Sequence, residues 1–205
     1  MIYTVTLNPA LDYFMDYDVF QIGAVNRTAQ TIISAGGKGI MESRMLSLLE
    51  VENTAFGFVG GFSGQFIKDF LSKNQILSNL TEIQEMTRIN VKLKSQENET
   101  SFDAAGPQIT DEEIQEFLIK FDNLKSDDIV VFAGTIPKML GENFYERLIE
   151  KVKAHHAQFV MDVDGQKLLK MGAQHVIVSM AADGAYLFVE NKVYFAAGIK
   201  GELKN

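Results

Sequence analysis

The chain has 205 residues, of which 46% are hydrophobic and 22% charged, and its formal net charge is −8. This composition predicts a globular chain with a large core, and the negative charge argues against a nucleic-acid partner. Without cysteine there are no disulfides or thiolate metal sites, and no apolar run is long enough to span a membrane. The first residues lack a basic region and a cleavage site, so we expect a cytoplasmic protein.

The first predicted strand covers residues 2–7, where β-forming residues alternate until Asn8-Pro9 ends the run. Asp12 follows, and we place it just past the carboxyl end of this strand, where open α/β sheets bind ligands. A carboxylate that holds substrate hydroxyls is one interpretation of Asp12, and a turn or cap residue is the other. Residues 14–20 and 25–33 then predict two strands of a flap that leaves the main sheet.

A glycine-rich loop comes next. Residues 34–40 (SAGGKGI) place Gly36, Gly37 and Gly39 around Lys38, directly before a pattern of helical period. Glycines let a ligand approach the main chain, and a helix start offers free N–H groups and a positive dipole end. Because many strand-to-helix turns are glycine-rich for steric reasons alone, the motif by itself leaves packing and phosphate binding equally open.

Strand and helix patterns alternate through most of the remaining chain, which predicts parallel strands with helical crossovers. The predicted helices are 41–50, 65–73, 114–121 and 142–155, and the predicted strands are 54–59, 89–94, 128–133, 158–163 and 175–179. Residues 110–113 (TDEE) predict a capping box before the third of these helices. Residues 185–189 and 193–196 predict a terminal hairpin.

Two features interrupt this alternation of strands and helices. Residues 100–102 are expected to pair with 89–94 as a second flap hairpin, and Arg88 begins that hairpin, either facing solvent or beside a sugar phosphate. Only residues 166–171 are available as a helix before strand 175–179, whereas a parallel crossover normally needs about a dozen residues or more. Either the two strands around this connection are not parallel neighbours, or residues are missing from it.

Six motifs, in their order and spacing, resemble the ribokinase-like family of sugar kinases. They occupy residues 4–12, 36–40, 58–62, 87–92, 133–137 and 178–185, so the resemblance covers nearly the whole chain. It implies an α/β fold, a ribokinase-like three-layer sandwich with a mainly parallel sheet and a small β flap. We expect one domain over residues 1–205, with flap strands from about 14–33 and 88–103 inserted.

The resemblance also implies an activity, the ATP-dependent phosphorylation of a ketose phosphate with Mg²⁺ sharing the charge of the transferred group. The motifs favour fructose 1-phosphate, converted to fructose 1,6-bisphosphate, over the alternative substrate tagatose 6-phosphate. By the resemblance, Ser179 and Gly184 would border ATP, and the substrate-binding residues would be Asp12, Gly36, Gly37, Lys38, Gly39 and Arg88. The expected partners are therefore small molecules only, with the flap as a candidate surface for a homodimer.

The sequence departs from the family at four places. Met41 stands where the family has a substrate-contacting asparagine, and Ala181 replaces a glycine of the nucleotide turn. A Lys-Pro-Asn motif is absent after Gly165, and the Gly-Ala-Gly-Asp motif with the catalytic aspartate would begin after Asn205. Without that motif we expect no effective general base, and we interpret both absences as omitted residues. A non-catalytic protein that binds sugar phosphates is the alternative from another class.

Overall fold

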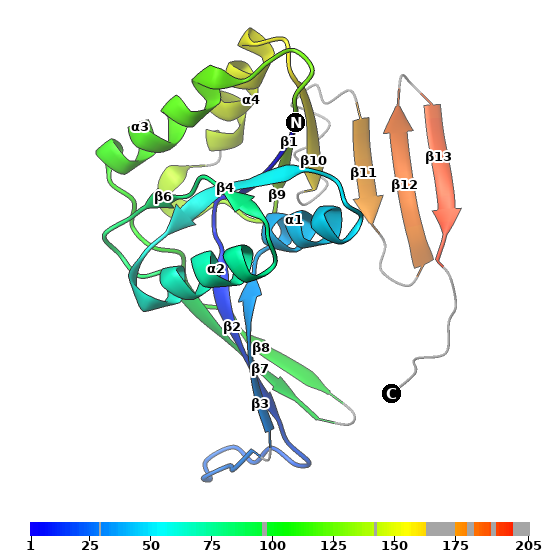
Figure 1. The fold of residues 1–205 in the computed structure, drawn as a ribbon. Helices are drawn as coiled ribbons and strands as arrows, with labels where there is room; N and C mark the ends of the chain where they lie inside the picture. The colour runs from blue at the N-terminus through cyan, green and yellow to red at the C-terminus, as the bar shows by residue number, and fades with distance from the viewer. Residues whose placement is uncertain are drawn as a thin grey trace.

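The computed structural model describes residues 1–28, 30–95, 98–141, 143–162, 175–179, 183–189 and 192–198. Within these residues a nine-stranded sheet forms the centre of the molecule, in the order β13-β12-β11-β10-β9-β1-β4-β5, with β6 paired to β4 (Figure 1). Its strands are β1 (Ile2–Thr6), β4 (Asn53–Val59), β5 (Leu77–Ser78), β6 (Thr81–Glu82), β9 (Ile129–Ala133), β10 (Gln158–Asp162), β11 (His175–Ser179), β12 (Gly184–Val189) and β13 (Lys192–Ala197). Neighbouring strands pair in parallel along the sheet from its β5 and β6 end as far as β11. The last two pairs, β11 with β12 and β12 with β13, are antiparallel.

Helices cover both faces of this sheet, as predicted (Figure 1). Two of them, α1 (Lys38–Leu48) and α2 (Gly61–Lys73), cover one face. The other face carries α3 (Asp111–Ile119), the 3₁₀ turn η1 (Lys120–Asn123) and α4 (Phe144–Ala154), and a second 3₁₀ turn η2 (Lys138–Leu140) precedes α4. The capping box predicted for α3 is present, because Thr110 and Glu113 each bond the other's backbone N–H.

The two faces have separate hydrophobic cores, and β4 supplies side chains to both. Phe58 of β4 packs on Phe117 of α3 with ring centroids 4.4 Å apart, and both rings are almost fully buried. On the opposite face, Val59 of β4 packs with Ile40 of α1 and Ile67 of α2. A strand that is buried on both sides is a continuous apolar run, which is why the sequence identifies β4 clearly.

A separate four-stranded sheet projects from the main sheet and forms the flap (Figure 1). Its order is β3-β2-β7-β8, and its strands are β2 (Ala10–Asp16), β3 (Gln30–Gly36), β7 (Arg88–Lys94) and β8 (Glu99–Phe102). The prediction of a small separate sheet is therefore confirmed. The predicted bounds of its first two strands, 14–20 and 25–33, were wrong by about four residues. The strand resumes directly after Pro9, because β2 pairs with β3 on one side and β7 on the other.

Four other predictions needed correction. Asp12, expected just past the first strand, is the third residue of β2, so the interpretation of it as a turn or cap residue is wrong. Helix α1 begins at Lys38, three residues before the predicted start, and α2 begins at Gly61, four before. The short connection before β11 had two interpretations, and the one in which the strands on either side of it are not parallel neighbours is wrong. Strands β10 and β11 pair in parallel through Met161 and Val176. The terminal hairpin is confirmed as β12 and β13.

Candidate active site

A cleft of 660 Å³ opens where the base of the flap meets the start of α1 and the end of β10. Its polar wall consists of Asp12, Ser34, Gly36, Lys38, Glu42 and Asp162. Its apolar wall consists of Phe14, Met41 and Met45. Strands β1, β9 and β10 all run toward this edge of the sheet, so the cleft lies at their carboxyl ends, where open α/β sheets bind ligands.

The carboxylate of Asp12 is held in the cleft by its neighbours in the flap. Asn90 of β7 is its cross-strand partner, and Asn90 Nδ2 donates a 2.9 Å hydrogen bond to Asp12 Oδ1. On the other side lies Gly36, where a Cβ atom would stand only 2.4 Å from Asp12 Oδ2. A glycine at position 36 is therefore required for this placement of the carboxylate, which faces the cleft in a position to accept hydroxyl hydrogen bonds.

The other glycines of the loop have different roles. Gly37 is the N-cap of α1 and has φ +119°, a conformation that a residue with a Cβ adopts only with strain. Its carbonyl accepts the first helical bond from Met41 N, so the amides before Met41 are free of helical bonds. Gly39 lies behind the loop, where a Cβ atom would meet Thr6 Oγ1 at 2.5 Å. Gly36 and Gly37 line the cleft and Gly39 permits packing against β1.

Lys38 extends from the first turn of α1 into the same cleft. Its Nζ lies 3.3 Å from Asp162 Oδ1, and the two side chains are 49% and 41% exposed. An ion pair this exposed contributes little to stability, so Lys38 can exchange Asp162 for the anionic group of a ligand.

Glu42 is a cleft residue that the sequence did not single out. Its Oε2 is buried and has no hydrogen-bond partner among the described residues. The pKa of Glu42 is raised from 4.5 to about 7, chiefly by burial and also by the charge of Asp162, while Lys38 acts in the opposite direction. The available signal was spacing, because residues four apart on a helix share a face and Glu42 follows Lys38 by four.

The raised pKa of Glu42 predicts a pH-dependent stability. Because the folded protein holds this proton to higher pH than the unfolded chain, the free energy of unfolding should fall as the pH rises from 4.5 through about 7. Glu42→Gln removes the ionisation, and after allowance for partial solvent exposure it should stabilise the protein by about 1–2 kcal/mol at pH 8. Urea unfolding at pH 5 and pH 8 measures this difference. The matched change Glu150→Gln, at an exposed position of α4, should have no such effect, and equal effects of the two changes would contradict the assignment.

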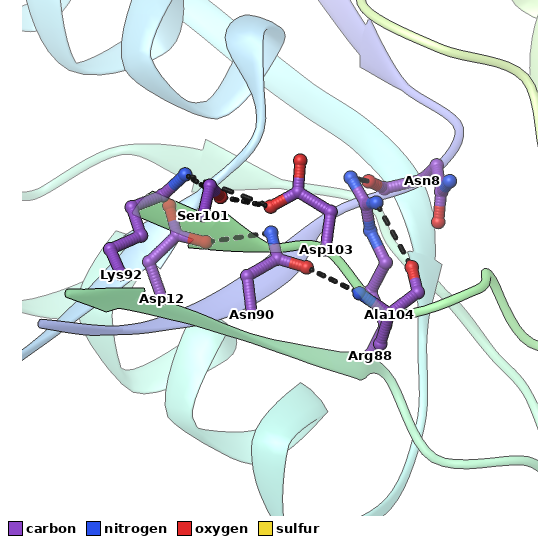
Figure 2. Close-up of polar contacts among 8 residues, drawn as sticks. All are labelled: Asn8, Asp12, Arg88, Asn90, Lys92, Ser101, Asp103 and Ala104. Carbon is purple, nitrogen blue, oxygen red and sulfur yellow. Dashed lines mark hydrogen bonds and ion pairs between the residues drawn. The ribbon is translucent and has the colours of Figure 1, made fainter. Parts of the chain in front are cut away.

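Arg88, proposed from the sequence to bind phosphate, does not line the cleft. It begins β7 on the same face as Asn90, and its guanidinium donates to Asn8 O at 3.1 Å and Ala104 O at 3.3 Å (Figure 2). Its Nε is buried without a partner among the described residues. Lys38 therefore lines the cleft and Arg88 does not, and Asn90 lies between Asp12 and Arg88 (Figure 2).

The nucleotide side is only partly described. Ser179 ends β11 opposite Ala185, and Gly184 begins β12 with φ +122°. A Cβ atom on Gly184 would stand 2.1 Å from Ala196 O, so this glycine is needed for the pairing of β12 with β13. Ala181, which replaces a glycine of the family's nucleotide turn, lies outside the described residues. A role for Ser179 and Gly184 beside ATP stays a prediction.

The described residues contain neither a cluster of metal-binding side chains nor a helix that could span a membrane. Within those residues, no three His, Cys, Asp or Glu side chains lie close enough together to hold a metal ion. No helix of the described chain is both long and apolar enough to cross a membrane.

The amino-acid sequence matches that of a known protein family. The sequence pattern of the pfkB family carbohydrate kinases matches residues 5–166, which is most of the chain. The protein belongs to this family.

Named relatives refine the comparison. A 1-phosphofructokinase of Bacillus subtilis is 40% identical, over all of this chain and 80% of its own length. A tagatose-6-phosphate kinase of Staphylococcus epidermidis is 33% identical over 82% of this chain and 54% of its own length. The crystal structure of phosphofructokinase-2 from Escherichia coli in complex with fructose-6-phosphate matches the fold with a TM-score of 0.90. It covers all of this chain and 82% of that protein at 19% identity.

The alignment with the Bacillus protein is longer than this chain. It spans 244 positions and includes all 205 residues of this chain, so the relative has internal residues without a counterpart here.

Proposed function

We propose that this protein transfers the γ-phosphoryl group of ATP to a ketose phosphate, converting fructose 1-phosphate to fructose 1,6-bisphosphate. The observation that carries the proposal is the Asp12 carboxylate, set into the cleft by Asn90 and by the absence of a side chain at Gly36. The 40% identity to a 1-phosphofructokinase supports the choice of fructose 1-phosphate.

In this proposal the residues of the chain bind and orient the sugar. Asp12 accepts hydrogen bonds from sugar hydroxyls, and Lys38 and Arg88 neutralise the phosphate that the sugar already carries. The free amides and positive end of α1 attract negative charge at the cleft. Mg²⁺ bound to the ATP phosphates would share the charge of the transferred group. No residue of this chain is assigned as the proton acceptor, because the family's Gly-Ala-Gly-Asp motif has no match in the sequence.

Turnover of three sugars, measured on protein that has a complete active site, tests the proposal directly. Formation of ADP is measured with fructose 1-phosphate, tagatose 6-phosphate and unphosphorylated fructose. We expect the highest kcat/KM for fructose 1-phosphate and the lowest for fructose. The 33% identical relative makes tagatose 6-phosphate the second candidate, and a higher kcat/KM for that sugar would select it. Binding of sugar phosphates without any turnover would instead support the non-catalytic alternative, which the comparisons do not favour.

We further propose that the flap forms a homodimer. Several large apolar side chains on its strands and at its outer end are about half or more exposed, among them Val19, Ile22, Ile33 and Phe102. Burial of such a surface against a second copy would stabilise the pair. Sedimentation equilibrium should therefore show a dimer that Ile33→Lys converts to a monomer, and a monomeric wild-type protein would exclude this surface.

A further inference from the structure

A carboxylate lies between two cations of the flap. Asp103, just after β8, accepts a 2.7 Å hydrogen bond from Ser101 Oγ, and its Oδ1 lies 3.7 Å from Lys92 Nζ. Lys92 Nζ also donates to Ser101 Oγ at 3.1 Å. Arg88 lies on the other side of Asp103 (Figure 2). The pKa of Asp103 is below its usual range, chiefly because of the Ser101 hydrogen bond, with the charges of Lys92 and Arg88 acting in the same direction.

The groups around Asp103 are those that recognise phosphate. An ammonium, a hydroxyl and a guanidinium supply charged and neutral donors, and phosphate oxygens accept such bonds at least as well as a carboxylate does. Lys92 shares its face of the sheet with Phe14, its cross-strand partner, and Phe14 lines the cleft. The cation pair is thus on the cleft side of the flap, although the sequence had singled out only Arg88.

The segment that carries Asp103 is tied to the sugar-binding residues. Ala104 N donates to Asn90 Oδ1 at 3.1 Å, and Asn90 Nδ2 donates to Asp12 Oδ1 at 2.9 Å. Ala104 O accepts from Arg88 Nη1 at 3.3 Å. Figure 2 shows these bonds as one network from Asp12 to Arg88. Asp103 therefore directly precedes a residue whose backbone bonds both Arg88 and Asn90, the residue that orients Asp12.

We propose that Asp103 is a specificity-determining residue, which occupies the place of the substrate's phosphate between Lys92 and Arg88 until the phosphate displaces it. The proposal rests on the proposed function for the identity of the substrate. It adds Lys92 as a second phosphate-binding residue on the Arg88 side and Asp103 as its internal competitor.

Exposure and charge make this exchange feasible. The Asp103 side chain is 57% exposed and that of Lys92 only 21%, so the carboxylate can turn into water while the ammonium stays. The ion pair that is lost is weak because it is exposed. A phosphate carries more negative charge than a carboxylate and gains both cations. An unphosphorylated sugar offers no such replacement, so it leaves Asp103 in place.

Removal of the competing charge tests the proposal. Asp103→Asn should tighten the binding of both inorganic phosphate and fructose 1-phosphate by about 2- to 10-fold, since an exposed pair is weak, and leave ATP binding unchanged. Lys92→Gln should weaken binding of the same two ligands. Isothermal titration calorimetry measures all of these affinities. The matched control is Asp122→Asn, which removes a half-exposed carboxylate paired with Lys151 and should change none of them.

The outcomes separate the two proposals. If wild-type protein binds fructose 1-phosphate but Asp103→Asn binds it equally or more weakly, this inference is overturned and the proposed function stands. If wild-type protein binds no sugar phosphate, the proposed function itself fails. A thermal melt of each variant shows whether it is folded. If Asp103→Asn does not fold, Lys92→Gln decides, because unchanged phosphate affinity in that variant also overturns the inference.

Discussion

Asp12→Ala should lower kcat/KM for fructose 1-phosphate by about 10- to 100-fold while leaving the KM for ATP nearly unchanged. Charge-assisted hydrogen bonds typically contribute about 1.5–3 kcal/mol, and about 1.4 kcal/mol corresponds to a factor of ten. The Asp12 carboxylate faces the cleft and is oriented by Asn90, so its loss should act on the sugar alone. Steady-state kinetics with each substrate varied in turn measures the effect.

Two further variants make the Asp12 result specific. Asp16→Ala removes a carboxylate from the same face of β2, four residues further out and away from the cleft lining, and should have little effect. Gly36→Ala should mimic Asp12→Ala, because the new methyl group would occupy space within 2.4 Å of Asp12 Oδ2. Equal losses with sugar phosphate and ATP would instead show that Asp12 is a structural residue of the flap.

Arg88→Ala should raise the KM for fructose 1-phosphate by about 10-fold or more and reduce the preference for phosphorylated over unphosphorylated fructose. The guanidinium can hold a phosphate through two parallel hydrogen bonds, which a lysine cannot reproduce, so Arg88→Lys should recover little of the loss. The KM for ATP should stay nearly unchanged. Competition kinetics with fructose and fructose 1-phosphate measures the preference for the phosphorylated sugar.

A structural role of Arg88 needs a separate control, because its guanidinium also bonds the carbonyls of Asn8 and Ala104. Arg147→Ala removes an exposed arginine of α4 that stacks on Phe144, far from the flap, and should leave all kinetic constants unchanged. If Arg88→Ala lowers the melting temperature and impairs both substrates alike, Arg88 supports the flap and Lys38 remains as the phosphate anchor.

Local patterns in the sequence were sufficient for most of the architecture. The apolar run of β4, the capping box at Thr110 and the Asn8-Pro9 break each act over a few residues, and each marks an element that the structure contains. The alternation of strands and helices predicted the parallel sheet, and the two hairpin patterns predicted the flap. Boundaries were less certain because the continuation of β2 from Ala10 depends on pairing with β7, a strand 78 positions away.

Only the tertiary structure decided how the cleft residues act on one another. The sequence identified Asp12, Lys38 and Arg88 one at a time, but Lys38 meets Asp162 across 124 positions of the chain. The raised pKa of Glu42 and the contacts of Asp103 likewise depend on burial and on charges from other elements. Spacing along a chain reports periodicity within one strand or helix. The packing of the elements sets the distances between strands of different sheets. It therefore also decides which carboxylates and cations compete with one another.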